Sequence, residues 1–304
     1  MKFSFKHEVY SYAEVGRGGL GNLLFPWARC LLWSHIHGVT ALPPHWFRIR
    51  LGPWLRRERD KRQYHILFRA PKLSDRLLRS AALLRLPHRP EPSLRAAPSG
   101  AGVYMFQGLR DYFAPLRGHH EAIGSALRAI LKPAHVPPRK VTAFIAIHIR
   151  RGDFTMPTSD QQLREGGINY RVPVEWYREV LRAIRAGVGA AVPAVVFSDG
   201  DPRDLLEILK EPLTSLHSSR SAVSDLLTMS QAGVLIASGS TFSMWASFLG
   251  QVPSVWYPGQ RREALLDGDR ALRLEPEWDG GRFSAEFAAA MSRRLSQRAE
   301  SRRV

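Results

Sequence analysis

The second half of the chain alternates short apolar runs with amphipathic segments. The runs are rich in Val, Ile and Ala and predict buried strands, whereas the segments between them place apolar residues at helical spacing. Predicted strands span residues 141–149, 194–197, 234–237 and 252–257. Predicted helices span residues 173–186, 202–210, 222–230, 242–250 and 283–299. Strands that alternate with helices are typical of a parallel, doubly wound α/β sheet with right-handed crossovers.

The first half is less regular, but it opens on the same pattern of strand, turn and helix. We predict strands at 9–15, 40–44 and 103–106 and helices at 23–37 and 119–131. Prolines at 133, 137 and 138 follow the last of these helices, and such links often separate domains. We therefore predict an N-terminal domain of residues 1–138, a C-terminal domain of residues 139–280, and a basic helix and tail at 281–304.

A basic stretch interrupts the first half. Arginine is frequent between residues 45 and 100, and we interpret this region as an insertion into the N-terminal domain. Within it, residues 73–86 place leucine at helical spacing among arginines, which predicts a basic amphipathic helix. Two interpretations stay open: the helix lies on an anionic membrane surface, or it is an ordinary helix with a solvated basic face.

Size and charge narrow the class of protein. A length of 304 residues favours two domains over a single core. The net charge of +17 indicates an anionic partner, which is a membrane surface, a nucleic acid or a phosphorylated substrate. The single cysteine, Cys30, excludes a disulfide framework and a cysteine-based zinc site. With no signal-like start and no apolar run of membrane-spanning length, we expect a cytoplasmic protein, with peripheral contact at the inner membrane face as an alternative.

The strand at 141–149 carries the first candidate chemistry. It ends in Arg150, Arg151, Gly152 and Asp153, and ligands of open α/β sheets bind where such strands end. Guanidinium groups match phosphate oxygens, so this loop is a candidate anion site. His148 lies one strand repeat before Arg150 and points to the same side. Arg151 points to the opposite side, so a ligand-binding and a structural role both stay open for it.

Two further turns precede predicted helices. The glycine-rich turn at 16–21, with Gly19 and Gly21, allows the backbone to lie close to a ligand at a helix N-terminus. Ser240 and Thr241 offer hydroxyl and N–H groups at a second strand-to-helix turn, where simple helix capping is the alternative.

Taken together, three segments resemble the family 11 glycosyltransferases, which are α-1,2-fucosyltransferases that use GDP-fucose. Their order and gaps also fit, over roughly residues 16 to 257. The segments are Gly18-Gly19-Leu20-Gly21-Asn22 with Phe25, His148-Ile149-Arg150-Arg151-Gly152-Asp153, and Ser240-Thr241-Phe242-Ser243 with Trp245. Departures from the family pattern are Leu23 and Gly239, where glutamine and asparagine are common, and Met244-Trp245, where a tryptophan pair is common.

The resemblance implies a GT-B-like fold of two Rossmann-like domains that face a cleft, with the donor bound mainly by the C-terminal domain. It implies an inverting transfer of fucose to a glycan hydroxyl, in particular that of a galactoside. The N-terminal domain would take the acceptor, a glycan or a lipid-linked oligosaccharide. No metal or other cofactor is expected.

The resemblance also implies residue roles. Arg150 would contact the β-phosphate and stabilise the charge that builds on GDP as fucose leaves. Asp225 would accept from the guanine edge, and Asn22 would approach the scissile oxygen or the acceptor. Asp153 is the candidate base, whereas a route in which phosphate takes the proton needs no carboxylate. The other implied donor-binding residues are His148, Arg151, Ser240, Thr241, Phe242, Gly19 and Gly21.

Two other classes of function stay open. Asp199-Gly200-Asp201 is a DxD pattern, which in a different class of nucleotide-sugar transferase holds manganese. The basic stretch at 50–95 would also suit a nucleic-acid-binding protein, although no recognised nucleic-acid motif is present. We expect loop and helix-cap roles for the two aspartates and no nucleic-acid partner.

Overall fold

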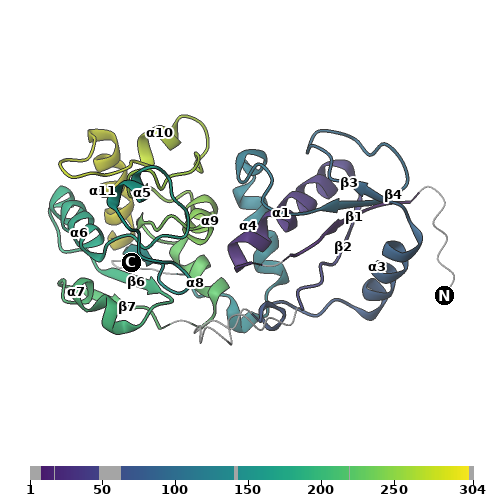
Figure 1. Cartoon of the computed structure of the whole chain (residues 1–304), viewed down its shortest axis with the longest axis horizontal. Coiled ribbons are helices and arrows are strands. Elements are labelled where there is room, and N and C mark those ends of the chain that lie inside the picture. Colours follow the sequence, from purple (N-terminus) through teal and green to yellow (C-terminus); the bar gives the residue numbers. More distant parts are fainter. Residues whose placement is uncertain (1–7, 17, 48–62, 140–142, 219, 301–304) are drawn as a thin grey trace. The chain divides into compact units, whose positions relative to one another are not determined.

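The computed structural model describes residues 8–16, 18–47, 63–139, 143–218 and 220–300 (Figure 1). These residues form two compact units: an N-terminal unit up to Lys132 and a C-terminal unit from Pro133 onward. Each unit is an α/β structure built on one parallel sheet. None of the described helices has the length and apolar character that crossing a membrane requires.

The N-terminal unit is built on a four-stranded parallel sheet of order β2-β1-β4-β3. Its helical elements include short 3₁₀ turns at Tyr64–Ile66 and Ala114–Leu116. The strands are β1 (Val9–Ala13), β2 (Thr40–Leu42), β3 (His88–Pro90) and β4 (Gly102–Phe106). The helices are α1 (Leu20–His37), α3 (Leu73–Arg85) and α4 (His120–Ile130).

Helix α1 connects β1 to β2 and is buried along most of its length. It ends at Gly38, whose φ of 62° is the left-handed conformation that terminates many helices. Arg29 lies inside the unit and pairs with Glu91, with Nε 2.5 Å from Oε1. Its guanidinium also donates to the carbonyls of Gln107, Gly108 and Arg110. This one buried cation therefore ties α1 to the segments that follow β3 and β4.

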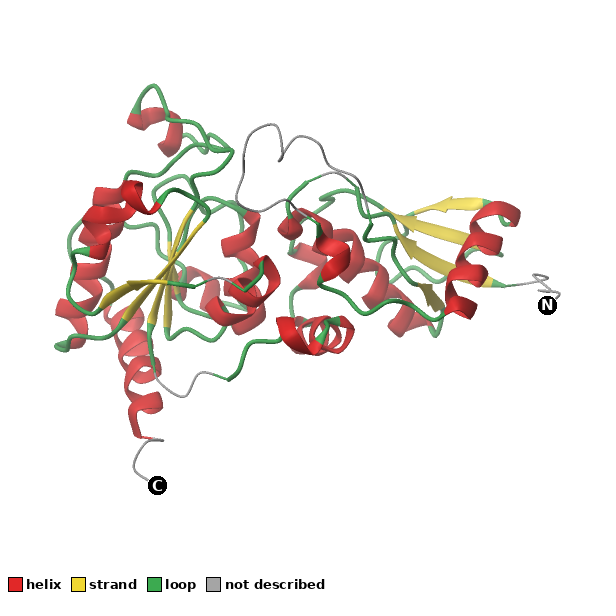
Figure 2. Ribbon diagram, turned by 90° about the horizontal axis from the view of Figure 1, so that it is seen from below, coloured by secondary structure: helices red, strands yellow, loops and turns green. Residues whose placement is uncertain are grey.

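The C-terminal unit is built on a five-stranded parallel sheet of order β7-β6-β5-β8-β9, with helices on both faces (Figure 2). A 3₁₀ turn at Pro133–His135 opens the unit, and another at Pro202–Leu205 precedes α7. The strands are β5 (Ile145–Ile149), β6 (Ala194–Ser198), β7 (Thr214–Leu216), β8 (Val234–Ile236) and β9 (Ser254–Val255). The helices are α5 (Asp160–Arg164), α6 (Val174–Val188), α7 (Leu206–Leu209), α8 (Ala222–Met229), α9 (Thr241–Gly250), α10 (Arg270–Leu274) and α11 (Ala285–Glu300).

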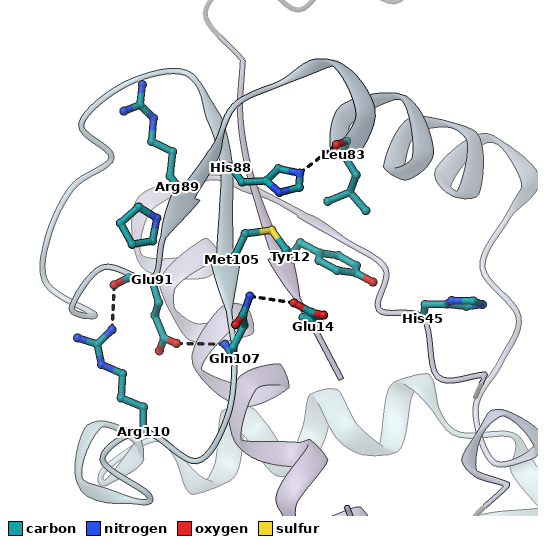
Figure 3. A pocket seen from close by; sticks show the side chains of 11 residues that line it. Tyr12, Glu14, His45, Leu83, His88, Arg89, Glu91, Met105, Gln107 and Arg110 are labelled. Carbon is teal, nitrogen blue, oxygen red and sulfur yellow. Dashed lines mark hydrogen bonds between the residues drawn. The ribbon is translucent and has the colours of Figure 1, made fainter. Parts of the chain in front are cut away.

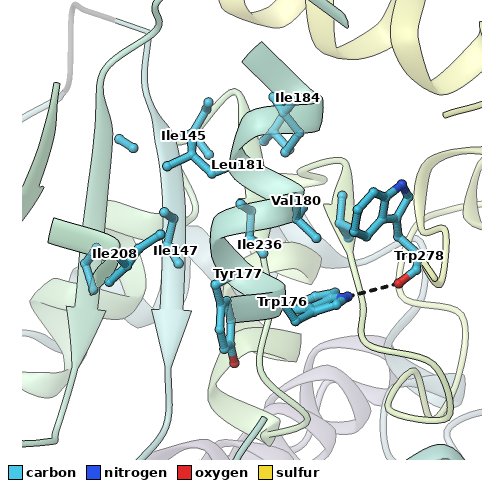
Figure 4. Packing of buried hydrophobic residues seen from close by; sticks show 14 of the residues in the cluster. Ile145, Ile147, Trp176, Tyr177, Val180, Leu181, Ile184, Ile208, Ile236 and Trp278 are labelled. Carbon is cyan, nitrogen blue, oxygen red and sulfur yellow. Dashed lines mark hydrogen bonds between the residues drawn. The ribbon is translucent and has the colours of Figure 1, made fainter. Parts of the chain in front are cut away.

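Strand β5 is the centre of this sheet, and all five of its residues are buried. Helix α6 covers one face with Val180, Leu181 and Ile184, which pack toward Ile145 and Ile147 (Figure 4). Each such fully buried aliphatic side chain contributes about 1.5–3 kcal/mol from the removal of its surface from water. A strand that is apolar except for His148 is thus covered on both faces.

The predicted alternation of strands and helices is found in the C-terminal unit, with local differences. The predicted helix at 202–210 is a 3₁₀ turn followed by the short α7, and Asp201 caps the turn by accepting from the Arg203 N–H at 2.9 Å. Helix α11 belongs to the core of the unit, since Phe287, Met291 and Leu295 are buried in the same cluster as β5. Residues 141, 142 and 301–304 of the predicted elements lie outside the described residues.

The basic region at 45–100 differs from the predicted insertion. Its described part supplies α3 as predicted, but also β3, which forms the edge of the N-terminal sheet. Residues 87–102 are rich in Pro, Ala, Ser and Gly, a composition that predicts a loop. A three-residue edge strand that ends in Pro90 escapes such a prediction, because an edge position tolerates the missing proline N–H. Residues 48–62 lie outside the described part.

Glu275 is a fully buried carboxyl group beside β9. One of its oxygens, Oε2, accepts from the N–H groups of Leu265 and Leu266 at 3.0 and 3.4 Å. Burial raises the pKa of Glu275 to about 7, although these two hydrogen bonds act in the opposite direction. The folded protein therefore holds a proton that the unfolded chain releases between about pH 4.5 and pH 7.

We expect the free energy of unfolding to fall as the pH rises through this window, by on the order of 3 kcal/mol from Glu275 alone. Glu275→Gln should remove this dependence, because its amide keeps the shape and cannot ionise. Urea unfolding at pH 5 and pH 8 measures both proteins. The exposed Glu286→Gln is the control and should behave like wild type; an unchanged pH slope in Glu275→Gln would contradict the assignment.

Candidate functional site

The carboxyl ends of β5, β6 and β8 lie side by side and carry the loops predicted to bind an anion. In the parallel register, Ile149 pairs with Ser198 and Ile147 pairs with Ile236. The Arg150 loop, the Asp199 loop and the turn before α9 therefore leave the sheet at the same edge. This edge is where open α/β sheets bind their ligands.

Arg150 is held by two carboxylates. Its Nη1 lies 2.5 Å from Asp199 Oδ2, and its Nη2 lies 2.6 Å from Asp153 Oδ1. The guanidinium carbon lies 5.5 Å from the centre of the Phe154 ring. The side chain is still 23% exposed, and a guanidinium has five N–H donors. Arg150 is thus fixed in place and retains donors for an anion from solvent.

Asp199 connects the two loops. Its Oδ1 accepts from the backbone N–H of Arg151 at 2.8 Å, while Oδ2 faces Arg150. A Cβ at position 152 would lie 2.3 Å from Asp199 Oδ2, so only glycine leaves room for this carboxylate. The glycine in the motif therefore serves the placement of Asp199, a residue for which the sequence predicted a loop or helix-cap role, with a metal motif as the alternative.

Arg151 points into the unit and not toward the Arg150 guanidinium. It is 6% exposed, and its Nη1 donates to the Val172 carbonyl at 3.3 Å. A Cβ at Gly200 would lie 2.7 Å from Arg151 Cβ, so the two loops pack tightly at this point. Strand parity separated the two arginines, and the structural role is the one that the geometry favours. The implied contact of Arg151 with the donor does not fit its burial.

His148 lies at the end of β5 within a cluster of hydroxyl groups. Its Nδ1 is 2.6 Å from Ser243 Oγ and 2.9 Å from Ser238 Oγ, and its ring centre is 5.3 Å from that of Phe242. Burial lowers the pKa of His148 to about 4; Asp199 opposes this shift and Arg150 adds to it. The imidazole is therefore neutral at pH 7 and acts as a hydrogen-bonding group.

The turn before α9 places Ser240 at the helix N-cap. Ser240 Oγ accepts from the Ser243 N–H at 3.4 Å and lies 3.1 Å from Ser238 Oγ. The capping role of Ser240 is confirmed. Thr241 and Phe242 form the half-buried first turn of the helix. Sequence analysis missed Ser238, which closes the cluster from the end of β8.

Gly239 lies at a position where family 11 commonly has asparagine, and the side chain of Gln260 leaves no room for asparagine here. A Cβ at this position would lie 2.0 Å from Gln260 Oε1. Gln260 is buried and donates from Nε2 to the Leu163 carbonyl at 2.7 Å. The space of a larger side chain is thus filled by Gln260. Arg262 donates to the Gly239 carbonyl at 3.3 Å, which adds a second cation beside this turn.

Asp225 lies in the first turn of α8 with an unsatisfied carboxylate oxygen. Its Oδ1 is buried, makes no hydrogen bond within the described part of the chain, and is 3.4 Å from His217 Nε2. The His217 ring, which follows β7, lies 4.5 Å from the ring of Phe197. A buried oxygen without a hydrogen bond beside aromatic surface is costly unless a ligand supplies a donor. This arrangement suits a planar group with N–H donors along one edge.

The glycine-rich turn lies in the N-terminal unit. Gly18 has a φ of 137°, and Gly19 is the N-cap of α1. Gly21 and Asn22 belong to the first turn of the helix, which begins at Leu20 and not at Leu23 as predicted. The predicted roles of Gly19, Gly21 and Asn22 in substrate binding stay predictions.

The two carboxylates of the DxD pattern are engaged within the protein. Asp199 holds the Arg150 loop, and Asp201 pairs with Arg203 at 2.8 Å. Hydrogen bonds from Arg203 lower the pKa of Asp201 to about 2. Across the described ranges, no cluster of three or more His, Cys, Asp or Glu side chains is arranged to hold a metal ion. The expected metal independence stays a prediction.

Asp199→Asn should weaken anion binding at Arg150, because the amide keeps the size of the side chain but loses one of the two ion pairs that fix the guanidinium. We expect the affinity for inorganic pyrophosphate to fall about tenfold, which is about 1.4 kcal/mol. Asp201→Asn, in the same loop, is the matched control and should bind as wild type does. Isothermal titration calorimetry measures all three proteins. Equal affinities in the two variants would refute the role assigned to Asp199.

The chain was compared with known proteins. Residues 112–257 match the model of glycosyl transferase family 11. Curated proteins provide no significant match. Similar solved structures include NodZ α-1,6-fucosyltransferase co-crystallised with GDP (15% identity, 84% of this chain and 96% of that chain, TM-score 0.47) and fucosyltransferase NodZ from Bradyrhizobium (16%, 82% and 94%, 0.46). POFUT1 in its apo form is also similar (13%, 84% and 99%, 0.45).

No residue role is transferred from these structures, because the TM-scores are below 0.5. The matched family segment, by contrast, contains the whole C-terminal sheet and all three loops at its carboxyl edge. The resemblance of the three motifs to the family 11 glycosyltransferases is therefore supported by the family model over residues 112–257.

Proposed function

We propose that the protein transfers fucose from GDP-fucose to a hydroxyl of a glycan, with inversion, as a galactoside α-1,2-fucosyltransferase. The observation that carries the proposal is the fixed Arg150 guanidinium at the carboxyl edge of the C-terminal sheet, within a segment that matches family 11. The choice of fucose, and of the α-1,2 linkage, rests on the resemblance of the three motifs to this family.

In this proposal, Arg150 stabilises the leaving group. As the bond between the sugar C1 and the β-phosphate oxygen breaks, its electron pair stays on GDP and negative charge builds there. A guanidinium that Asp153 and Asp199 already hold in place needs no reorganisation at that moment, so it lowers the barrier more than a mobile one would. His148 is neutral and is held by hydrogen bonds with Ser238 and Ser243. It therefore forms a hydrogen bond with the nucleotide and adds no second positive charge at the phosphates.

Asp225 is proposed to select guanine. Guanine presents N1–H and N2–H along one edge, and the carboxylate oxygen that lacks a hydrogen bond can accept from them. The ring of His217 would lie against the base, supported by its contact with the buried ring of Phe197. Adenine and uracil do not offer this pair of donors to a single carboxylate.

The proton of the acceptor hydroxyl needs a destination. We propose an oxocarbenium-like route: the bond between C1 and GDP breaks, the acceptor oxygen bonds to C1 from the opposite face, and its proton passes through solvent to a phosphate oxygen of the departed GDP. Asp153 then acts through its ion pair with Arg150, which occupies its Oδ1 at 2.6 Å. Direct action of Asp153 as the base is the alternative, and Asn22 stays a predicted contact of the acceptor.

We also propose that the protein acts at the cytoplasmic face of an anionic membrane, where a lipid-linked oligosaccharide would be its acceptor. The support is a stripe of exposed leucines on α3: Leu73, Leu77 and Leu84 are 67%, 52% and 84% exposed. They fall within about 40° of one another around the helix axis. Exposed Arg76 and Arg85 lie on the same helix. Apolar side chains that face water beside cations suit a helix lying in a lipid headgroup layer.

A panel of nucleotide sugars in EDTA tests the activity. We expect transfer or donor hydrolysis with GDP-fucose and none with UDP- or ADP-sugars. Arg150→Ala should lower kcat at least about a hundredfold, as the loss of a charge-stabilising donor does. Asp225→Asn should lower kcat/KM for GDP-fucose through KM. Loss of activity in EDTA with rescue by manganese would support the metal-dependent class instead, and GDP-mannose as the sole donor would exclude fucose.

Co-sedimentation with vesicles tests the membrane proposal. We expect binding to vesicles that contain phosphatidylglycerol, weaker binding at high salt, and no binding to pure phosphatidylcholine. Replacing Leu73, Leu77 and Leu84 with serine should abolish measurable binding, since each substitution removes about three apolar carbons and each buried CH₂ contributes about 0.8 kcal/mol. Leu206 and Leu213, which are also exposed, provide a double leucine-to-serine control. Wild-type protein that stays in solution at low salt would contradict the proposal.

A further inference from the structure

The N-terminal unit contains a pocket of about 690 Å³ at the carboxyl end of its sheet (Figure 3). Tyr12 of β1, Met105 of β4 and Pro90 of β3 occupy the same register and so line one face of the sheet. Leu83 of α3 borders the same space. Helix α3 covers this face nearer the amino ends of the strands, where Ala82 packs in a cluster with Tyr10 and Val103. The pocket begins where that cover ends.

Polar side chains surround the apolar part of the pocket. Glu14 and Gln107 lie two residues beyond Tyr12 and Met105, on the same face by strand parity. The Glu14 N–H donates to the Phe106 carbonyl at 2.9 Å, which extends the sheet ladder to this residue. Glu14 Oε2 accepts from Gln107 Nε2 at 2.8 Å (Figure 3). The two side chains therefore hold each other in fixed positions.

The opposite side of the rim is also fixed. Arg110 Nη1 donates to the Glu91 carbonyl at 3.1 Å, and Glu91 pairs with the buried Arg29. Carboxylate, amide and guanidinium groups thus meet around an apolar floor. The lining also includes His45, His88 and Arg89, so it mixes carboxylates with cations and does not present cations alone, as a phosphate site would. It suits a neutral polyol, whose hydroxyl groups bond to planar polar side chains and whose C–H face lies on apolar surface.

We infer that this pocket binds one or two sugar units of the acceptor glycan, with Glu14 and Gln107 bonded to sugar hydroxyls and with Tyr12 and Met105 against the C–H face. The inference rests on the proposed function, because only that function makes the bound glycan an acceptor. The volume lies within the range of about 300–1,000 Å³ that small-molecule sites occupy. The residues come from the ends of three strands and are fixed by the sheet, which pre-organises the site.

Saccharide binding tests the inference. The probes are the methyl glycosides of galactose, glucose, N-acetylglucosamine and mannose, measured by saturation-transfer NMR and calorimetry. We expect at least one to bind wild-type protein, and Glu14→Gln and Gln107→Ala to weaken that binding about tenfold, as the loss of a hydrogen bond to a charged or amide group does. Glu121→Gln, an exposed carboxylate on α4, is the matched control and should leave binding unchanged.

GDP titration of the same proteins separates this inference from the proposed function. All variants should bind GDP as wild type does, which also shows that they are folded. If no glycoside binds, or if binding survives both pocket substitutions, the inference is wrong even when GDP binds normally. If wild type does not bind GDP but glycoside binding depends on Glu14 and Gln107, the saccharide pocket stands and the proposed function fails.

Discussion

The geometry of the C-terminal site depends on one carboxylate, Asp199. It lies at the end of β6, yet its two oxygens hold the backbone and the guanidinium of the loop that follows β5. Without this link, the only ion pair left to Arg150 would be the one with Asp153, which lies three residues away in the same loop. Gly152 and Gly200 are required by the same contact, because a side chain at either position would displace Asp199 or Arg151. The motif Arg-Arg-Gly-Asp is therefore half of a structure whose other half is Asp-Gly-Asp.

The site separates charge from hydrogen bonding. Arg150 supplies the positive charge at the surface, whereas the buried layer beneath it is neutral: His148, Ser238, Ser240 and Ser243 bond to one another. A cation in that buried layer would carry a desolvation cost, and burial lowers the pKa of His148 so that it stays neutral. The positive charge of the site is thus carried by Arg150, with Arg262 beside the turn before α9.

Much of this arrangement could be predicted from local pattern. Strand parity placed His148 beside Arg150 and turned Arg151 away, because side chains alternate along a strand whatever surrounds it. The contacts of Asp199 and Ser238 could not be predicted, since they depend on which strands are neighbours in the sheet. Asp199 is 48 residues from its partner Arg151, and Ser238 is 90 residues from His148. The pocket at Glu14 was missed for the same reason, because its walls come from three strands and a helix.

The central claim is that Arg150 binds the diphosphate of a guanine nucleotide. Calorimetry with GDP and with guanosine tests it most directly, because the two ligands share the base and differ in the phosphates. We predict that wild type prefers GDP by about a hundredfold, or about 2.7 kcal/mol. Arg150→Ala should lose most of this preference and bind guanosine as before. A variant that keeps the full preference for GDP would contradict the account.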